Sequence, residues 1–320
     1  MGWLRRAFIA LSESSRAQDL VLHHPWARRA SRRFVAGETL AEAVAAVREL
    51  NRAGLHASLN YLGEKTTSAA EADRAAAMYV TILEAIRREG LDGNLSVKLS
   101  QLGVTMDEGA AAERLRRVVD AARQQETFVR IDMEESPLVE PTLRLWRHLW
   151  DAGYRNVGVV IQAYLYRSAA DVQMLIGLGA RVRLVKGAYL EPPSVAYPRK
   201  ADVDENYRRL MEALLRGGHY PAIATHDERL IAHAKALAAR EGIGRDRFEF
   251  QMVYGVRRDL QLRLAREGYH VRVYVPFGEQ WYPYFMRRLA ERPANVLFLL
   301  RALVAEGVRP GRTPSVDRTG

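Results

Sequence analysis

Short β-rich runs alternate with longer amphipathic stretches between residues 56 and 291, and this alternation constrains the fold more than any other feature. The short runs predict eight strands, at residues 56–62, 94–99, 127–133, 156–162, 181–185, 222–226, 248–253 and 271–275. Apolar residues at helical spacing predict helices at residues 69–88, 110–124, 141–152, 168–177, 202–216, 227–241, 257–267 and 281–291. Strands that alternate with helices pair in parallel, and eight such units predict an α/β fold with a closed (βα)8 TIM-like barrel.

An open, doubly wound α/β sheet is the alternative to the barrel. When that fold binds a dinucleotide it carries a GxGxxG turn after an early strand, and this sequence has none there. The length of 320 residues suits one large domain. We expect N-terminal accessory helices in residues 1–52, with helical patterns at 3–11 and 39–51, the barrel in residues 53–308, and a disordered tail in residues 309–320.

The charge of the chain limits its partners. The formal net charge is +10, but the 48 Lys and Arg residues are interleaved with 38 acidic ones. No basic block and no known nucleic-acid-binding motif accompanies this charge, so we expect no nucleic-acid partner. Arginine pairs at residues 5–6, 28–29 and 32–33 are compatible with a peripheral contact at an anionic membrane surface.

The chain has no cysteine, which excludes disulfides, thiolate nucleophiles and Cys-ligated metal centres. Its histidines form no HExxH pattern, so we expect no metal site. The apolar run at residues 7–11 is too short for the core of a signal peptide, and no run is long enough to span a bilayer. We expect a cytoplasmic protein, either free or peripheral at the inner face of the membrane.

The last predicted helix carries a polar stripe. Tyr284, Arg287, Arg288 and Glu291 are spaced i, i+3, i+4 and i+7, which places them on one face. Two adjacent guanidiniums beside an aromatic ring suit a small carboxylate, because each guanidinium offers a planar fork of donors. A solvated basic surface is the alternative interpretation of the stripe.

In a (βα)8 barrel the chemistry takes place at the C-terminal ends of the strands. Polar residues stand at or just after these ends: Glu64, Lys98, Asp132, Glu134, Gln162, Arg183, Lys186, Thr225, His226, Gln251 and Tyr274. A carboxylate-binding site without a Ser or Cys nucleophile motif favours redox chemistry or isomerisation of a small acid over covalent hydrolysis.

The segment at residues 183–189 suggests an organic cofactor. Gly187 allows close approach of the backbone, and Lys186 carries a charge that suits a phosphate. Donors at the strand ends suit a cofactor with ring heteroatoms, which would accept a hydride that side chains cannot. A lysine at a strand end is also the nucleophile of Schiff-base aldolases, so Lys98 and Lys186 keep that alternative open.

Several separated motifs occur in one order along the chain: residues 96–103, 131–134, 160–164, 183–189, 224–226, 250–252 and 284–291. Over residues 61 to about 300 this series resembles the proline dehydrogenase family, FAD-dependent enzymes that oxidise L-proline to Δ1-pyrroline-5-carboxylate. The resemblance implies a distorted barrel with the C-terminal helix over the active site. It also implies a monofunctional bacterial enzyme, because 320 residues leave no room for the second dehydrogenase domain found in some relatives.

The resemblance also implies roles for individual residues. The catalytic pair is Asp132, which keeps Lys98 charged, and Arg183, which stabilises the reduced flavin. The substrate-binding residues are Lys98, Leu184, Tyr189, Tyr274, Tyr284, Arg287 and Arg288, of which Lys98 and the two arginines bind the carboxylate. Glu64 is the gate, since it pairs with Arg287. The flavin-contacting residues are Met133, Gln162, Lys186, Gly187, Ala188, Thr225 and His226.

The mechanism implied by the resemblance is hydride transfer from the carbon beside the substrate nitrogen to FAD, followed by reoxidation by a membrane quinone. No strong general base is needed if the amine binds neutral, so we expect turnover to rise with pH. Tyr274 implies a preference for proline over hydroxyproline. A Schiff-base barrel aldolase and a non-catalytic basic binding protein are the remaining hypotheses.

Overall fold

The computed structural model describes residues 31–291 of the chain. Two compact units are present: residues 35–279, and a second unit whose described parts are residues 31–34 and 280–291. The helical pattern at residues 3–11 and the tail at residues 309–320 lie outside the described residues. The first unit contains every strand of the described chain.

Eight strands close into one barrel, in which each strand pairs in parallel with its neighbours in the chain. The strands are β1 (His56–Tyr61), β2 (Gly93–Val97), β3 (Val129–Ile131), β4 (Val157–Gln162), β5 (Val182–Val185), β6 (Ala222–Ala224), β7 (Glu249–Val253) and β8 (His270–Phe277). The ladder between β1 and β8 closes the ring, with Ala57 opposite Val273. The predicted (βα)8 barrel is therefore confirmed.

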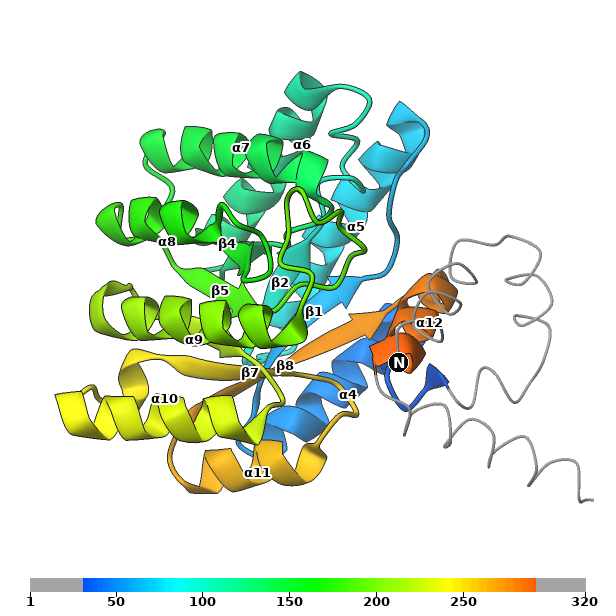
Figure 1. Ribbon diagram of the computed structural model, residues 1–320. Helices are drawn as coiled ribbons and strands as arrows, with labels where there is room; N and C mark the ends of the chain where they lie inside the picture. The colour runs from blue at the N-terminus through cyan, green and yellow to red at the C-terminus, as the bar shows by residue number, and fades with distance from the viewer. Residues whose placement is uncertain (1–30, 292–320) are drawn as a thin grey trace, which may run out of the picture. The chain divides into compact units, whose positions relative to one another are not determined.

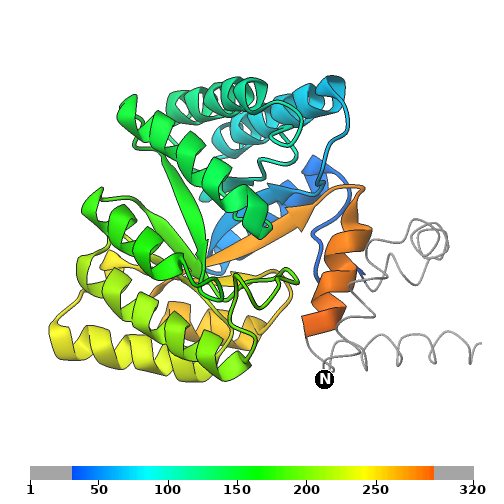
Figure 2. The same ribbon diagram turned by 45° about the horizontal axis from the view of Figure 1, so that its top comes forward.

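Helices follow the strands and lie outside the sheet, as Figure 1 shows for α7 to α10 and Figure 2 shows from a second direction. The helices that follow β1 to β7 are α5 (Ala69–Arg88), α6 (Glu108–Gln124), α7 (Val139–Asp151), α8 (Ser168–Gly177), α9 (Lys200–Gly217), α10 (Glu228–Glu241) and α11 (Arg258–Arg266), whereas α4 (Leu40–Arg52) precedes β1. Two 3-10 turns, η1 (Ser136–Leu138) and η2 (Arg245–Arg247), lie between them. Each helix matches a predicted one to within two residues at either end.

Side-chain caps explain where several helices begin. The Ser68 side chain accepts a hydrogen bond from the backbone N–H of Glu71 at the start of α5, and Asp107 accepts one from Ala110 at the start of α6. Such caps satisfy backbone donors that have no partner inside the helix. Helix α10 ends at Gly242, whose φ of +65° favours glycine.

Helix α4 precedes the barrel in the chain and packs against β1 and β8. A capping box formed by Thr39 and Glu42 fixes its first turn. Its buried face consists of Ala43, Val44, Ala46, Val47 and Leu50. The domain boundary near residue 52 stays a prediction, since residues 1–30 lie outside the described part of the chain.

The inside of the barrel is polar to an unusual degree. Alternate strand residues are buried polar or charged groups: Ser58, Asn60, Asn94, Ser96, Arg130, Arg183, Glu249 and Gln251. Barrel interiors are more often filled by Val, Ile and Leu. Burial of polar groups costs free energy unless they are hydrogen-bonded, and here they contact one another across the barrel, as with Arg183 and Ser96.

The apolar core lies between the strands and the surrounding helices. Its largest fully buried side chains include Tyr79 of α5, Trp146 of α7 and Tyr207 of α9. The hydroxyl of Tyr207 donates to the backbone oxygens of Leu184 and Ala224, at the ends of β5 and β6. This contact ties α9 to the ends of two adjacent strands.

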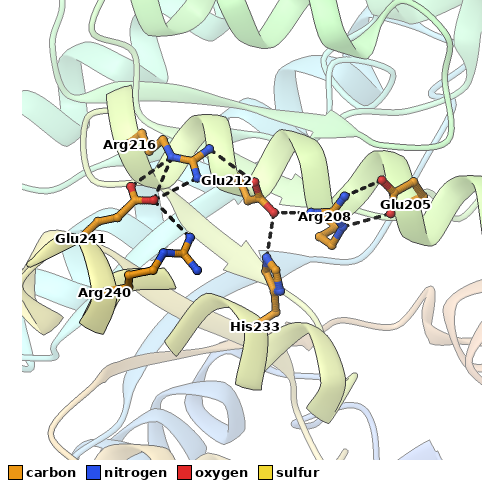
Figure 3. A network of polar contacts seen from close by, with 7 residues as sticks. All are labelled: Glu205, Arg208, Glu212, Arg216, His233, Arg240 and Glu241. Carbon is orange, nitrogen blue, oxygen red and sulfur yellow. Dashed lines mark hydrogen bonds and ion pairs between the residues drawn. The ribbon is translucent and has the colours of Figure 1, made fainter. Parts of the chain in front are cut away.

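A network of polar contacts joins α9 to α10 (Figure 3). Glu212 of α9 lies 2.8 Å from Nε2 of His233 on α10, and Arg216 of α9 donates to Glu241 at 3.0 Å. Arg208 and Glu205 extend the network along α9. Exposed ion pairs contribute roughly 0–1 kcal/mol each, so the network orients the two helices more than it stabilises the fold.

The described part of the second unit contains α12 (Trp281–Glu291), at the bounds predicted from the sequence. Pro283 lies in its first turn, where a missing N–H is tolerated. Within this unit the Phe285 ring packs against Trp281 and Phe34, with centroid distances of 5.9 and 6.3 Å. In the part of the chain that the structure describes, no helix has both the length and the apolar character of a membrane span.

Candidate active site

Asp132 is the centre of a charged cluster at the C-terminal ends of the strands. Its Oδ1 accepts a 2.7 Å hydrogen bond from Nη1 of Arg183, and its Oδ2 accepts a 2.6 Å hydrogen bond from the hydroxyl of Tyr274. Nζ of Lys98 lies 3.5 Å from the same Oδ2. These residues come from β5, β8 and the loops after β2 and β3, so the barrel brings together four of the predicted site residues.

The cluster holds two cations for one carboxylate. The side chains of Arg183, Asp132 and Lys98 are 5%, 8% and 11% exposed, so water screens them little. The two cations, together with the donors of Lys98, favour binding of an anionic group such as a carboxylate. That property is the one predicted for the substrate pocket.

The pKa of Lys98 supports a permanently charged group. Burial alone lowers the pKa of this ammonium, but surrounding groups raise it well above its ordinary value. Those groups are Tyr274, Tyr189, Asp132 and Glu64. Burial and the Asp132 charge also raise the pKa of Tyr274 well above its usual value. At neutral pH, Tyr274 is therefore a neutral donor and Lys98 a cation.

Two serines that were not predicted as site residues accept hydrogen bonds from Arg183. Nη2 of Arg183 donates to Ser96 Oγ at 3.0 Å and to Ser58 Oγ at 3.4 Å, and Ser58 in turn donates to Asn94 at 2.6 Å. The Nε of Arg183 is buried and has no hydrogen-bond partner among the described residues. Polar residues at alternate positions in β1 and β2 were the available signal for this support.

A buried carboxylate braces the loop that carries Lys98. Glu134 accepts a 2.9 Å hydrogen bond from the backbone N–H of Ser100 and a second one from its hydroxyl. Ser100 Oγ accepts from the backbone N–H of Lys65 at 3.3 Å, and its carbonyl accepts from Thr66 Oγ1 at 3.1 Å. The brace thus joins the loops that carry Lys98 and Glu64.

Glu134 was predicted only as a polar residue at a strand end, and Ser100 was given no role. Burial raises the pKa of Glu134, an effect that Lys98 and the hydrogen bonds from Ser100 partly offset. The backbone oxygen of Glu134 accepts a 2.8 Å hydrogen bond from Nε2 of Gln162, which fixes the chain after Met133. Gln162 therefore has a structural partner besides any cofactor.

Lys186 follows β5 directly and contacts two carboxylates. Its Nζ donates to Asp204 of α9 at 2.6 Å and to Asp227, before α10, at 3.1 Å. Neither aspartate was predicted as part of the site. Gly187 has a φ of +120°, and a Cβ there would lie 2.4 Å from the Tyr164 ring, so this position requires glycine.

The predicted residues after β6 shape their own loop. Thr225 Oγ1 accepts a 3.1 Å hydrogen bond from the backbone N–H of Asp227. Nε2 of His226 accepts one from the backbone N–H of Val253 at 3.0 Å, which places the proton of the neutral ring on Nδ1. Both residues thus set the path of the chain between β6 and α10.

Some predicted site residues lie just after a strand, not inside it as the sequence had predicted. Lys98, Met133, Thr225 and His226 were expected inside strands, but β2, β3 and β6 end earlier, at Val97, Ile131 and Ala224. The cause is that the parallel ladders stop there and the chain turns into the loops of the site. Ala188 and Tyr189 lie in the partly exposed segment after β5.

The remaining predicted residues fall into two groups. Leu184 of β5 is fully buried in the apolar core, so its contact with a substrate stays a prediction. Tyr284, Arg287 and Arg288 lie on α12 of the second unit, where the Arg288 guanidinium carbon is 5.0 Å from the centre of the Tyr284 ring. In residues 31–291, no group of three or more His, Asp or Glu side chains is arranged to hold a metal ion.

Comparisons with known proteins identify the family of this chain. A sequence model of proline dehydrogenases matches residues 43–301. The chain is 43% identical over 304 residues to Proline dehydrogenase of Deinococcus radiodurans, covering 94% of this chain and 97% of that protein. It is 42% identical over 301 residues to Proline dehydrogenase 1 of Bacillus subtilis, covering 94% and 99%.

Solved structures show the same fold. Proline utilization A (PutA) from Bdellovibrio bacteriovorus, inactivated by N-propargylglycine, superposes with a TM-score of 0.78 at 27% identity over 88% of this chain. The chain spans 34% of that protein, about a third of its length. The family match covers most of the present sequence, including every strand of the barrel. The chain belongs to the proline dehydrogenase family.

Proposed function

We propose that the protein oxidises L-proline to Δ1-pyrroline-5-carboxylate as the first step of proline catabolism, with FAD as hydride acceptor and a membrane quinone as final electron acceptor. Family membership supports an oxidoreductase that acts on proline. The observation that carries the proposal is the buried cluster in which Asp132 contacts Arg183, Tyr274 and Lys98. A cytoplasmic location with peripheral membrane contact belongs to the same proposal.

The residues at the strand ends fit a flavin. Arg183 has a buried Nε donor without a partner among the described residues, and a ring heteroatom would satisfy it. Bound FAD would supply a ring nitrogen that accepts a hydride. The residues proposed to hold it are Met133, Gln162, Lys186, Gly187, Ala188, Thr225 and His226.

Arg183 is proposed to stabilise negative charge that develops on the cofactor. A preorganised cation does this well because it need not reorient during the reaction. Here the guanidinium is held by Asp132 on one nitrogen and by Ser96 and Ser58 on another. Its orientation is therefore set before any substrate binds.

Lys98, Arg287 and Arg288 are proposed to bind the substrate carboxylate, with Glu64 as the partner of Arg287 that closes the site. Lys98 suits this role because its raised pKa keeps it charged at any pH at which the enzyme would work. The walls for the substrate ring are proposed to be Leu184, Tyr189, Tyr274 and Tyr284.

The positive charges of Lys98 and Arg183 also favour the neutral form of the substrate amine, because they would repel a protonated amine. The nitrogen lone pair of a neutral amine can form the C=N bond as the hydride leaves the neighbouring carbon, and the N–H proton is then released to solvent. No side chain has to act as a strong base. Turnover is therefore expected to rise with pH until the free amine predominates.

The Schiff-base aldolase has less support. A lysine nucleophile needs a depressed pKa, whereas the pKa of Lys98 is raised. The Nζ of Lys186 is already held in ion pairs with two carboxylates, Asp204 and Asp227. A non-catalytic binding protein does not explain the buried cluster around Asp132, in which Nε of Arg183 has no hydrogen-bond partner among the described residues.

The proposal is tested with the purified protein and L-proline. Its visible absorption spectrum should show an oxidised flavin that bleaches when proline is added without oxygen, and proline should drive reduction of a redox dye. Cyclopentanecarboxylate, which has the ring and carboxylate but no amine, serves as the control and should cause no bleaching. Absence of both flavin and proline-dependent reduction would refute the proposal.

A further inference from the structure

Lys186 is held by an arrangement of opposite charges at the ends of β5 and β6. Asp204 contacts Lys186 through Oδ1 at 2.6 Å and Lys200 through its other oxygen. Asp227 contacts Lys186 through Oδ2 at 3.1 Å, while its Oδ1 caps α10 by accepting from the backbone N–H of Arg229. Two ammonium groups thus face two carboxylates.

The two aspartates are ionised at neutral pH. Burial raises the pKa of Asp204 and Asp227, but the hydrogen bond from Lys186 and other nearby donors and charges outweigh burial and lower both values. The side chains of Lys186, Asp204 and Asp227 are 28%, 29% and 31% exposed, so an incoming ligand can reach them. The local charge of the four groups sums to zero.

This balance conflicts with the role proposed for Lys186. A lysine that binds the phosphates of FAD gains most when no carboxylate lies beside it, because carboxylates repel phosphate. An ammonium has three donors, and the contacts within the described residues use two of them. One donor thus remains for a phosphate, in a direction that the two aspartates set.

We propose that Asp204 and Asp227 are positioning residues that aim Lys186 at the FAD phosphates and, by their charge, limit the affinity for FAD. The inference rests on the proposed function, since it assumes that FAD is the cofactor and that Lys186 contacts it. Replacement of either aspartate by asparagine separates the two effects. The single amide oxygen can still accept from Lys186, but the negative charge is lost. An NH2 group then replaces the oxygen that contacts Lys200 at Asp204, or the oxygen that caps α10 at Asp227.

The test is a titration of the apoprotein with FAD, in which the quenching of flavin fluorescence measures binding. Asp204→Asn and Asp227→Asn should each bind FAD about two- to fivefold more tightly, the size expected for one partly exposed charge. The double variant should bind more tightly than either single one. Lys186→Met should bind FAD about tenfold more weakly, as expected for loss of one charge-assisted hydrogen bond.

Asp202→Asn is the matched control. Asp202 lies on α9 like Asp204, but it pairs with the exposed Arg199, so FAD affinity should not change. Thermal unfolding of each apoprotein checks that the variants fold. A purely structural role for the aspartates predicts weaker binding, which is the opposite sign.

The possible failures can be told apart. Unchanged or weaker FAD binding by both folded asparagine variants would overturn the inference. Normal FAD binding by Lys186→Met would overturn it too, because Lys186 would then not contact the cofactor. If the unaltered apoprotein binds no FAD at all, the proposed function itself fails.

Discussion

Asp132 and Arg183 meet inside the barrel, where Oδ1 of the carboxylate lies 2.7 Å from Nη1 of the guanidinium. The first follows β3 and the second belongs to β5, so their side chains reach past the intervening β4. Both are buried, and the second oxygen of Asp132 is shared by Tyr274 and Lys98. One carboxylate therefore orients three of the polar side chains that are proposed to face the substrate and the flavin ring.

Asp132→Asn should reduce kcat/KM for proline at least about 100-fold, because at least one charge-assisted hydrogen bond is lost and two buried cations lose their counter-ion. Steady-state kinetics with the flavin-loaded variant measures this. Asp151→Asn is the matched control: the exposed Asp151 pairs with Arg147 in the last turn of α7, before the start of β4, and its loss should leave kcat/KM unchanged. Wild-type kinetics in Asp132→Asn would contradict a catalytic role.

Tyr274 allows its hydroxyl and its ring to be tested separately. Tyr274→Phe removes the donor to Asp132 but keeps the ring, whose centre lies 5.3 Å from the Arg183 guanidinium carbon. Loss of this hydrogen bond from a neutral donor to a charged group should lower kcat/KM of Tyr274→Phe about 10-fold. Tyr274→Ser also removes the wall, so its preference for proline over hydroxyproline should fall. If kinetics with both substrates leave the preference intact in Tyr274→Ser, the wall assignment is wrong.

The two arginines of α12 should act on substrate binding. Arg287→Ala and Arg288→Ala should each raise KM for proline roughly 10- to 150-fold, the equivalent of about 1.5–3 kcal/mol for a charged hydrogen bond. Lysine at either position should restore little, because it lacks the planar fork of donors. Arg209→Ala, an exposed arginine of α9, is the control and should have no effect on KM. Unchanged KM in both α12 variants would defeat the assignment.

Ser100→Ala should disturb the proposed substrate site, although Ser100 is not itself proposed to contact the substrate. The change removes a hydroxyl that donates to Glu134 and accepts from the backbone of Lys65, so the loops with Lys98 and Glu64 lose their common brace. We expect KM for proline to rise severalfold with little change in kcat, and Ser100→Thr to restore it. Thr127→Val removes a comparable hydrogen bond to Gly93, before β2 and β3 reach the site, and should leave KM unchanged. Equal effects of the two changes would indicate a general loss of stability.

Glu249 should govern stability in acid. It is 2% exposed and accepts from Nε of Arg272 at 3.0 Å. Burial raises the pKa of Glu249, but Arg272, Gln251 and Arg130 bring it below the ordinary 4.5. A carboxylate with a lowered folded pKa contributes stability above its unfolded pKa, and the contribution disappears as pH falls through the folded value. The free energy of unfolding should therefore decrease below about pH 4.5.

Glu249→Gln tests the same residue at neutral pH. It leaves buried arginines without a counter-ion, so urea denaturation at pH 7 should show a free energy of unfolding lower by about 3–5 kcal/mol. The variant should also depend less on pH in the acid range. Glu241→Gln, which removes an exposed partner of Arg216 in the network of Figure 3, should cost less than about 1 kcal/mol. Comparable losses in the two variants would show that burial of Glu249 is not the deciding factor.

The local pattern of the chain was enough to predict the elements of the fold. Periodicity of two or 3.6 residues depends on neighbours a few positions apart, so each strand and helix could be recognised by itself, and α5, α8 and α12 have the predicted bounds. The closed barrel followed because eight alternating units have few other ways to pack. Strand ends were less certain, as Lys98 and Thr225 show, since a parallel ladder ends where its neighbour ends.

The sequence by itself determined the barrel, the polar residues at its strand ends and the arginine stripe of α12. Only the tertiary structure decided which of these residues meet. Asp132 and Tyr274 are 142 positions apart, and Ser58 reaches Arg183 across 125 positions, so no local pattern records either contact. The physical reason is that closure of the barrel and the register of its ladders set the direction of each inward side chain. The packing of α9 against β5 likewise brings Asp204 beside Lys186.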